Sequence, residues 1–243
     1  MEKNHHNNTG ICWQYLIKQK KAKAKNKTQF NYKGFIPEVK EIEISIAKQF
    51  ILEYEWLGNM GSANYYYGLF FGNHLASVVC FSNSVSPKAY TNLLGIKHNE
   101  ILLLCRGATA HWAPDWAPSK LISKTLKLIK NKYNIKVVVA YADPEAGEIG
   151  YIYQASNFYY WGLTNPGGSK KYKINGEIMH SRKVHRLFGT RKAEVLKKID
   201  KNYSAIATFP KHRYIYFTCN SYTKKLLMEK IKNLIKPYPK KDK

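Results

Sequence analysis

Cysteine is scarce in this chain, and no cysteine or histidine pair has the spacing of a metal site. The four cysteines, Cys12, Cys80, Cys105 and Cys219, lie far apart in a sequence of 243 residues. No CxxC, HxxxH or HxD pattern occurs. We therefore expect a reduced protein with free thiols, without a disulfide framework and without a metal ion held by such a pair.

Long apolar runs and glycine-rich phosphate loops are also missing. No apolar run approaches the roughly 18 residues of a membrane span, and the first residues, MEKNHHNNTG, lack the apolar centre of a signal peptide. Neither a Walker nor a Rossmann glycine pattern is present. These features disfavour membrane proteins and enzymes that bind NTP or NAD, and we expect a cytoplasmic protein with no membrane partner.

Acidic residues are few, and the excess of basic residues over them is unevenly distributed along the chain. The chain has 40 Lys and Arg against 16 Asp and Glu, a formal charge of +24. Residues 166–243 carry 21 basic and five acidic residues, whereas residues 46–165 carry 10 and seven. A lysine-rich composition also follows from an AT-rich genome, but clustering favours a surface for a polyanion, most simply nucleic acid. The candidate DNA contacts, which alternatively form a solvated basic face, are Arg182, Arg186, Arg191 and Lys192.

The hydrophobic pattern predicts a mixed α/β protein. Residues 35–42 are typical of an edge strand, 43–58 of a helix ended by Gly58, and 65–81 of a hairpin. Residues 100–109 and 135–143 are typical of buried strands joined by an amphipathic helix that is capped by Ser119. Residues 150–158 and 159–164 predict a short helix and a strand, 181–199 a basic helix broken at Gly189, and 212–219 a strand returning to the sheet edge. We expect a flexible basic arm over 1–34, a core over 35–165 and a basic C-terminal extension over 166–243.

Two strand ends in this pattern are predicted to form one wall of a cleft. The parallel strands end near Arg106–Thr109 and Tyr141–Asp143, and ligands favour such positions in open α/β sheets. Asp143, in YADPEAGEIGYIYQASN, is the candidate for acid or base chemistry, although Asp-Pro also starts turns. Ser119 is a helix cap more readily than a nucleophile. The candidates for contacts with substrate or donor are Arg106, His111, Trp112, Tyr141, Tyr153 and Asn157.

Three stretches resemble a known family. EWLGNMG (55–61), CRGATAHWAPDWAPSKLISK (105–124) and AYADPEAGEIGYIYQASNFYYWG (140–162) are similar to the phage Mom-type DNA-modification proteins. The resemblance covers roughly residues 43–165. It implies a GNAT-like fold, with a splayed central sheet, and a bacterial host cell as the location. It also implies carbamoylmethylation of the exocyclic N6 amine of adenine in double-stranded DNA, an anti-restriction modification.

The resemblance also suggests catalytic residues. Asp143 corresponds to the family's catalytic aspartate and Ser119 to a serine of its pattern. The family often has a His-Tyr pair where this chain has Glu55-Trp56, which makes Glu55 a candidate replacement base.

The group donor is not identified by the sequence. An acyl-CoA-type small molecule suits the fold, but the usual pyrophosphate-binding loop is absent from residues 106–119, and iron is implied by the resemblance alone. Two other functions stay open: an acetyl-CoA-dependent N-acetyltransferase acting on another amine, such as tRNA or a small molecule, and a non-catalytic nucleic-acid-binding protein.

Overall fold

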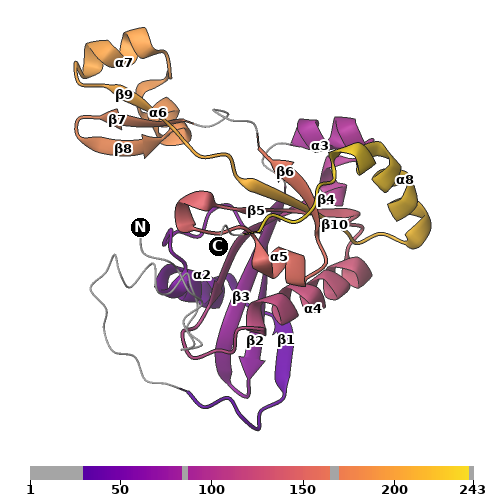
Figure 1. The fold of residues 1–243 in the computed structure, drawn as a ribbon. Coiled ribbons are helices and arrows are strands. Elements are labelled where there is room, and N and C mark those ends of the chain that lie inside the picture. Colours follow the sequence, from indigo (N-terminus) through magenta and orange to yellow (C-terminus); the bar gives the residue numbers. More distant parts are fainter. Residues whose placement is uncertain (1–29, 84–86, 165–169, 241–243) are drawn as a thin grey trace.

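The main body of the protein is built on one seven-stranded mixed sheet (Figure 1). The computed structural model describes residues 30–83, 87–164 and 170–240, so most of the arm expected over residues 1–34 lies outside the described residues. Neighbouring strands run antiparallel, except for β4 and β5, which are parallel. The mixed α/β class is therefore confirmed. In spatial order the strands are β1 (Pro37–Glu41), β2 (Tyr65–Phe71), β3 (His74–Asn83), β4 (Ile101–Thr109), β5 (Val137–Ala142), β10 (His212–Phe217) and β6 (Tyr159–Leu163).

Helices bury both faces of the central strands. Along β5, Val138, Ala140 and Ala142 pack into one core with α2 (Ile44–Tyr54), α4 (Ala117–Lys132) and α5 (Tyr151–Ala155). The alternating residues Val137 and Val139 pack into a second core with α3 (Pro87–Leu94) and α8 (Ser221–Ile231). Burial on both faces explains why β5 is a continuous run of apolar residues. Short 3-10 turns lie at His98–Glu100, Pro144–Ala146 and Lys232–Leu234.

The two parallel strands separate partway along their length. β4 pairs with β5 from Ile101 to Leu104, opposite Val137 to Ala140. Beyond Leu104, β4 continues to Thr109 beside β3. The register shifts there, since Phe81 faces Leu104 and Cys80 faces Arg106, which leaves Cys105 as the extra residue of a β-bulge. Bulges increase local twist, and the predicted splayed sheet is present.

Two helix boundaries and the position of one strand differ from the sequence prediction. Helix α2 ends at Tyr54 and not at Gly58, because Glu55 already has extended backbone angles. Helix α4 begins at Ala117 with Trp116 at the N-cap position, so the prediction that Ser119 caps it is wrong. Pro118 fits within the first turn, where a backbone N–H has no helical acceptor. Strand β10 lies between β5 and β6, one position inside the expected sheet edge.

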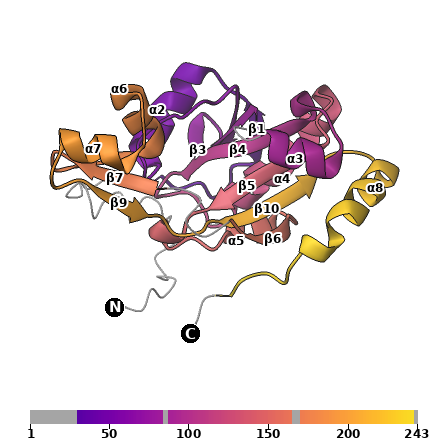
Figure 2. The same ribbon diagram turned by 90° about the horizontal axis from the view of Figure 1, so that it is seen from above.

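Between β6 and β10 the chain forms a small lobe that projects from the main body (Figures 1 and 2). Its sheet has the order β8-β7-β9, from strands Glu177–His180, Lys170–Ile174 and Ser204–Ala207. Helices α6 (Ser181–Phe188) and α7 (Ala193–Ile199) complete it, and the predicted break at Gly189 separates them. Its small core contains Tyr172, Ile174, Met179, Val184 and Leu196. The extension expected after residue 165 thus contributes this lobe and also a strand of the main sheet.

Gly150, just before α5, allows a close approach between the loop and β10. It has φ +85°, and an added Cβ would lie 2.6 Å from Cζ of Tyr214. We expect Gly150→Ala to lower the free energy of unfolding by about 3 kcal/mol, through backbone strain and overpacking. Gly58→Ala is the control, because Gly58 also has positive φ but no atom within 4 Å of the added Cβ. Equal losses in urea denaturation would show that the contact with Tyr214 is unimportant.

Candidate functional site

Asp143 lies directly after β5 and is fully engaged. Its Oδ1 accepts a hydrogen bond from the backbone N–H of Glu145 at 3.0 Å, which caps the 3-10 turn Pro144–Ala146. Its Oδ2 lies 2.6 Å from Nζ of Lys211. The side chain is 14% exposed, so it keeps some contact with solvent. The turn role and an acid–base role are therefore compatible at this residue.

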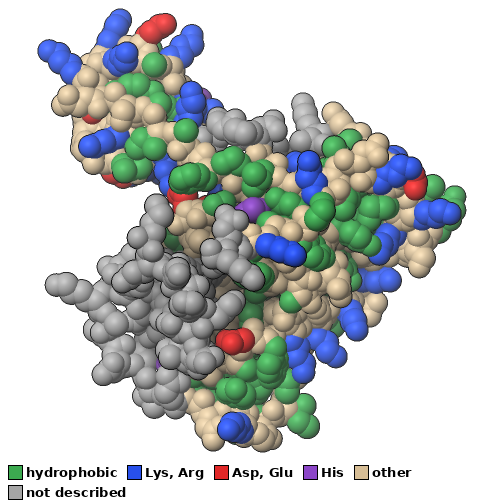
Figure 3. Space-filling model, in the orientation of Figure 1, with side chains coloured by type: hydrophobic (Ala, Val, Ile, Leu, Met, Phe, Trp, Pro, Cys, Tyr) green, Lys and Arg blue, Asp and Glu red, His purple; other side chains and the backbone are tan. Residues whose placement is uncertain are grey.

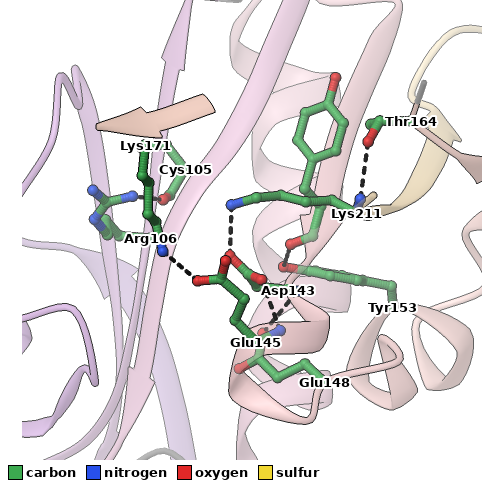
Figure 4. Close-up of polar contacts among 10 residues, drawn as sticks. Cys105, Arg106, Asp143, Glu145, Glu148, Tyr153, Thr164, Lys171 and Lys211 are labelled. Atoms are coloured by element: carbon green, nitrogen blue, oxygen red, sulfur yellow. Dashed lines mark hydrogen bonds and ion pairs between the residues drawn. The ribbon is translucent and has the colours of Figure 1, made fainter. Parts of the chain in front are cut away.

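Two lysines from beyond residue 165 reach the acidic loop of residues 143–148 (Figure 4). Lys211 precedes β10, and the pairing of His212 with Ala142 brings it beside Asp143. Its backbone N–H donates to Oγ1 of Thr164 and its carbonyl accepts from the N–H of Thr164, both at 2.9 Å. Lys171, on β7 of the lobe, lies 2.5 Å from Oε2 of Glu145. Sequence reasoning missed both lysines, because nothing local marks a contact across the fold.

A second group of charges gathers where β4 and β5 separate. Glu55, at the end of α2, is 4% exposed, and its Oε2 accepts from the N–H of Gly58 at 3.0 Å. Burial raises the pKa of Glu55, the charge of Arg106 and backbone hydrogen bonds oppose this rise, and the charge of Glu148 adds to it. Glu148 also accepts from the backbone N–H of Asp143 at 3.4 Å, which links the two groups.

Arg106 is held in a defined position on β4. Its Nε donates to the carbonyl of Asn59 at 2.7 Å, and its Nη2 donates to the side-chain oxygen of Asn59 at 2.5 Å. Gly61 leaves room for it, since an added Cβ would lie 3.1 Å from Nη2. The EWLGNMG stretch therefore both supplies Glu55 and orients the arginine.

Tyr153 borders this group from α5. Its Oη donates to the carbonyl of Tyr141 at 3.4 Å, and its ring packs against Phe158 and Tyr214. Burial, and then the charge of Glu148, raise the pKa of Tyr153. The hydroxyl therefore keeps its proton and can act as a donor.

The other predicted residues lie apart or take structural positions. Tyr141 points to the opposite face of the sheet, where its hydroxyl bonds to that of Tyr90, and burial raises its pKa. His111 is 5% exposed and stacks on Tyr54. Trp112 packs against Phe30 and Phe71. Ser119 donates to the carbonyl of Trp116 at 3.0 Å, and exposed Asn157 follows the C-cap of α5 with φ +60°.

The candidate DNA contacts all lie on the lobe, away from the acidic loop in sequence. Residues 170–207 contain 11 Lys and Arg against three Asp and Glu, and basic side chains are spread over its surface (Figure 3). Arg186, on α6, and Lys192, before α7, are exposed. Arg191 is exposed as well, and its Nε donates to the carbonyl of Ser181. Arg182 also lies on α6.

The described residues do not assemble an iron site. Within residues 30–83, 87–164 and 170–240, no group of three or more His, Cys, Asp and Glu could hold a metal ion. Asp143 and Glu145 are instead paired with lysines. The iron implied by the family resemblance therefore does not fit these residues. In the same part of the chain, no helix is long and apolar enough to cross a membrane.

The chain is similar to one protein family in sequence, and to solved acetyltransferases in fold. Residues 37–240 match the model of the Mom protein family. Methylcarbamoylase mom of Escherichia phage Mu is 27% identical over 175 residues, which are 71% of this chain and 70% of that protein. Among solved structures, an N-acetyltransferase from Staphylococcus aureus Mu50 matches with TM-score 0.43 and 10% identity, over 76% of this chain and 99% of that one. An acetyltransferase from Bacillus subtilis in complex with CoA matches with TM-score 0.43 and 9% identity, over 75% and 98%.

The raised pKa of Glu55 predicts how stability depends on pH. Folding favours the protonated form of this buried group, so its ionisation destabilises the fold as pH rises through the raised pKa. We expect Glu55→Gln to gain stability relative to the wild type as the pH rises above the ordinary pKa of a glutamate, about 4.3, measured by chemical denaturation. The control is Glu43→Gln, at the other end of α2, where the exposed side chain makes no cap hydrogen bond. A Glu55→Gln variant that lost relative stability with rising pH would contradict the burial argument.

Proposed function

Since the chain belongs to the Mom protein family, we propose that it is a transferase that modifies the exocyclic N6 amine of adenine in duplex DNA. The group transferred is of the carbamoylmethyl type, and the modified DNA resists restriction enzymes. The observation that carries this proposal is the position of Asp143: a partly exposed carboxylate at the end of β5, beside Lys211 and in a loop that Lys171 of the basic lobe contacts (Figure 4).

The exocyclic amine of adenine is a weak nucleophile. Its lone pair is delocalised into the adenine ring, so attack on a methylene carbon of the donor is slow unless a base removes a proton. As the N–C bond forms, the bond from that carbon to the donor's leaving group breaks, and the leaving group takes the electron pair. Asp143 accepts the amine proton, while Lys211 and the N–H of Glu145 hold its carboxylate in position. Arg106, whose guanidinium is oriented by Asn59, supplies N–H donors for the polar end of the transferred group.

The lobe binds the DNA backbone. Adenine is stacked inside the duplex, so it must be flipped out to reach Asp143. Flipping requires that flanking phosphates be held, and phosphate contacts come from exposed Lys and Arg. The lobe supplies such residues, including Arg186 and Lys192, and Lys171 ties it to Glu145 in the same loop as Asp143.

Replacement of the carboxylate tests the reaction. We expect DNA from cells that express the wild-type chain to contain an adenosine adduct, detected by nucleoside mass spectrometry. Asp143→Asn should lower its amount by about 100-fold, as is usual when a general base is lost. The matched control is Asp115→Asn, an exposed acid in the loop before α4, which should keep full modification. Unmodified DNA with acetyl-CoA turnover would support the acetyltransferase alternative, and binding without either activity would support the non-catalytic one.

Removal of positive charges from the lobe tests whether the lobe binds DNA. Each lost phosphate contact lowers the slope of log affinity against log salt by about 0.9. The double variant Arg186→Gln/Lys192→Gln should therefore bind a duplex more weakly, with a slope reduced by about 1.8, as measured by fluorescence anisotropy. Lys124→Gln/Lys127→Gln, on the exposed side of α4, removes the same charge elsewhere. Equal effects of the two double variants would mean that the lobe has no special role.

A further inference from the structure

A recess of about 420 Å³ lies at the outer end of the main sheet, distinct from the group around Asp143. It is formed by the end of edge strand β6, by Arg213 on β10 and by the segment after α8. Its volume is within the range of small-molecule sites. Its lining contains two cations, Arg213 and Lys236, and no Asp or Glu.

A β-bulge shapes this recess. In the pairing of β10 with β6, His212 faces Leu163 and Tyr214 faces Tyr160, so Arg213 lies opposite two residues, Trp161 and Gly162. Gly162 has φ +77°, which a residue with a side chain rarely adopts. Bulges commonly redirect a side chain near functional sites, and the residue affected here is an arginine.

Arg213 has an unused hydrogen-bond donor. Its guanidinium carbon lies 4.5 Å from the centre of the Trp161 ring, and its Nη2 donates to the Trp161 carbonyl at 3.2 Å. Its Nε is buried and has no hydrogen-bond partner within the described residues. The buried Nε1 of Trp161 has none there either. Buried donors without acceptors are costly in a folded protein, and an anion in the recess would provide an acceptor.

Lys236 supplies a second positive charge at the same place. Its backbone N–H donates to the carbonyl of Tyr160 at 2.9 Å, which ties the C-terminal segment to β6. Its side chain runs over Gly162, where an added Cβ would lie 3.5 Å from Cδ and Cε. No ion pair of Lys236 or Arg213 is present among the described residues. Two cations without a carboxylate are thus held around one recess.

We propose that this recess binds a phosphate group, held by the guanidinium of Arg213 and the ammonium of Lys236. A planar guanidinium suits two phosphate oxygens at once, and an ammonium adds a point charge. The recess begins at Thr164, which is hydrogen-bonded to Lys211 and so lies two strands from Asp143, roughly 10 Å away. At that distance the phosphate belongs either to the DNA backbone near the modified base or to a phosphorylated small molecule. The proposed phosphate site does not depend on the proposed modification of adenine.

Pyrophosphate is the probe for the site. We expect isothermal titration calorimetry of the full chain in about 0.15 M salt to show binding that Lys236→Gln weakens about tenfold or more, as for a lost charge-assisted bond. Arg213→Lys keeps the charge but loses the planar fork, and should weaken binding similarly. Lys225→Gln, an exposed residue on α8 outside the recess, is the matched control and should change affinity less than about twofold. Thermal denaturation checks that each variant is folded.

A duplex oligonucleotide distinguishes the two sources. If Lys236→Gln also weakens duplex binding more than Lys225→Gln does, and pyrophosphate competes with the duplex, the phosphate is that of DNA. If duplex affinity is unchanged while pyrophosphate affinity falls, the ligand is a phosphorylated small molecule. The proposal is overturned if the wild type does not bind pyrophosphate, or if Lys236→Gln and Lys225→Gln have the same effect on it. None of these readouts requires turnover, so they are independent of the proposed modification of adenine.

Discussion

The pairing of β10 with β5 is the contact on which the rest of the structure depends. Six consecutive residues, His212–Phe217, pair with Ala142–Val137, and β10 in turn holds β6 on its other side. The lobe is inserted between these neighbouring strands, so its two ends meet at Thr164 and Lys211. A basic insertion anchored in this way must lie close to the loop that follows β5. The register of this ladder thus brings Lys211 to Asp143, and the neighbouring ladder between β10 and β6 forms the recess beside Arg213.

The distribution of charge follows from the same arrangement. Two acids of the 143–148 loop, Asp143 and Glu145, are paired with lysines from the C-terminal part of the chain. Partly exposed pairs of this kind contribute little to stability, so their importance lies in where they hold the groups. DNA phosphates attract the same lysines, and their approach would change the field around Asp143. In the proposed function, DNA binding therefore changes the charges around the catalytic carboxylate, through Lys171 and Lys211.

The hydrophobic pattern of the sequence predicted most helices and strands. The order of the strands in the sheet, and the contacts between distant parts of the chain, became known only from the structure. Alternation and periodicity located the hairpin, the parallel pair and the helix between them, because burial on one face or both leaves a direct trace in sequence. The position of β10 inside the sheet leaves no such trace, since strand order is decided by packing. For the same reason Asp143, Arg106 and Tyr153 could be grouped from strand ends, but Lys171 and Lys211 could not. Tyr141 was grouped with them by proximity in sequence, yet alternation along β5 points it to the other face.

The proposed reaction requires that an adenine leave the duplex and meet the carboxylate of Asp143. A structure of the full chain bound to a duplex that contains its target adenine would show whether this happens. We expect one adenine out of the stack, with its N6 amine about 3 Å from the Asp143 carboxylate, and flanking phosphates on the lobe. A duplex bound with every base stacked, or bound on a surface away from β5 and the lobe, would contradict it.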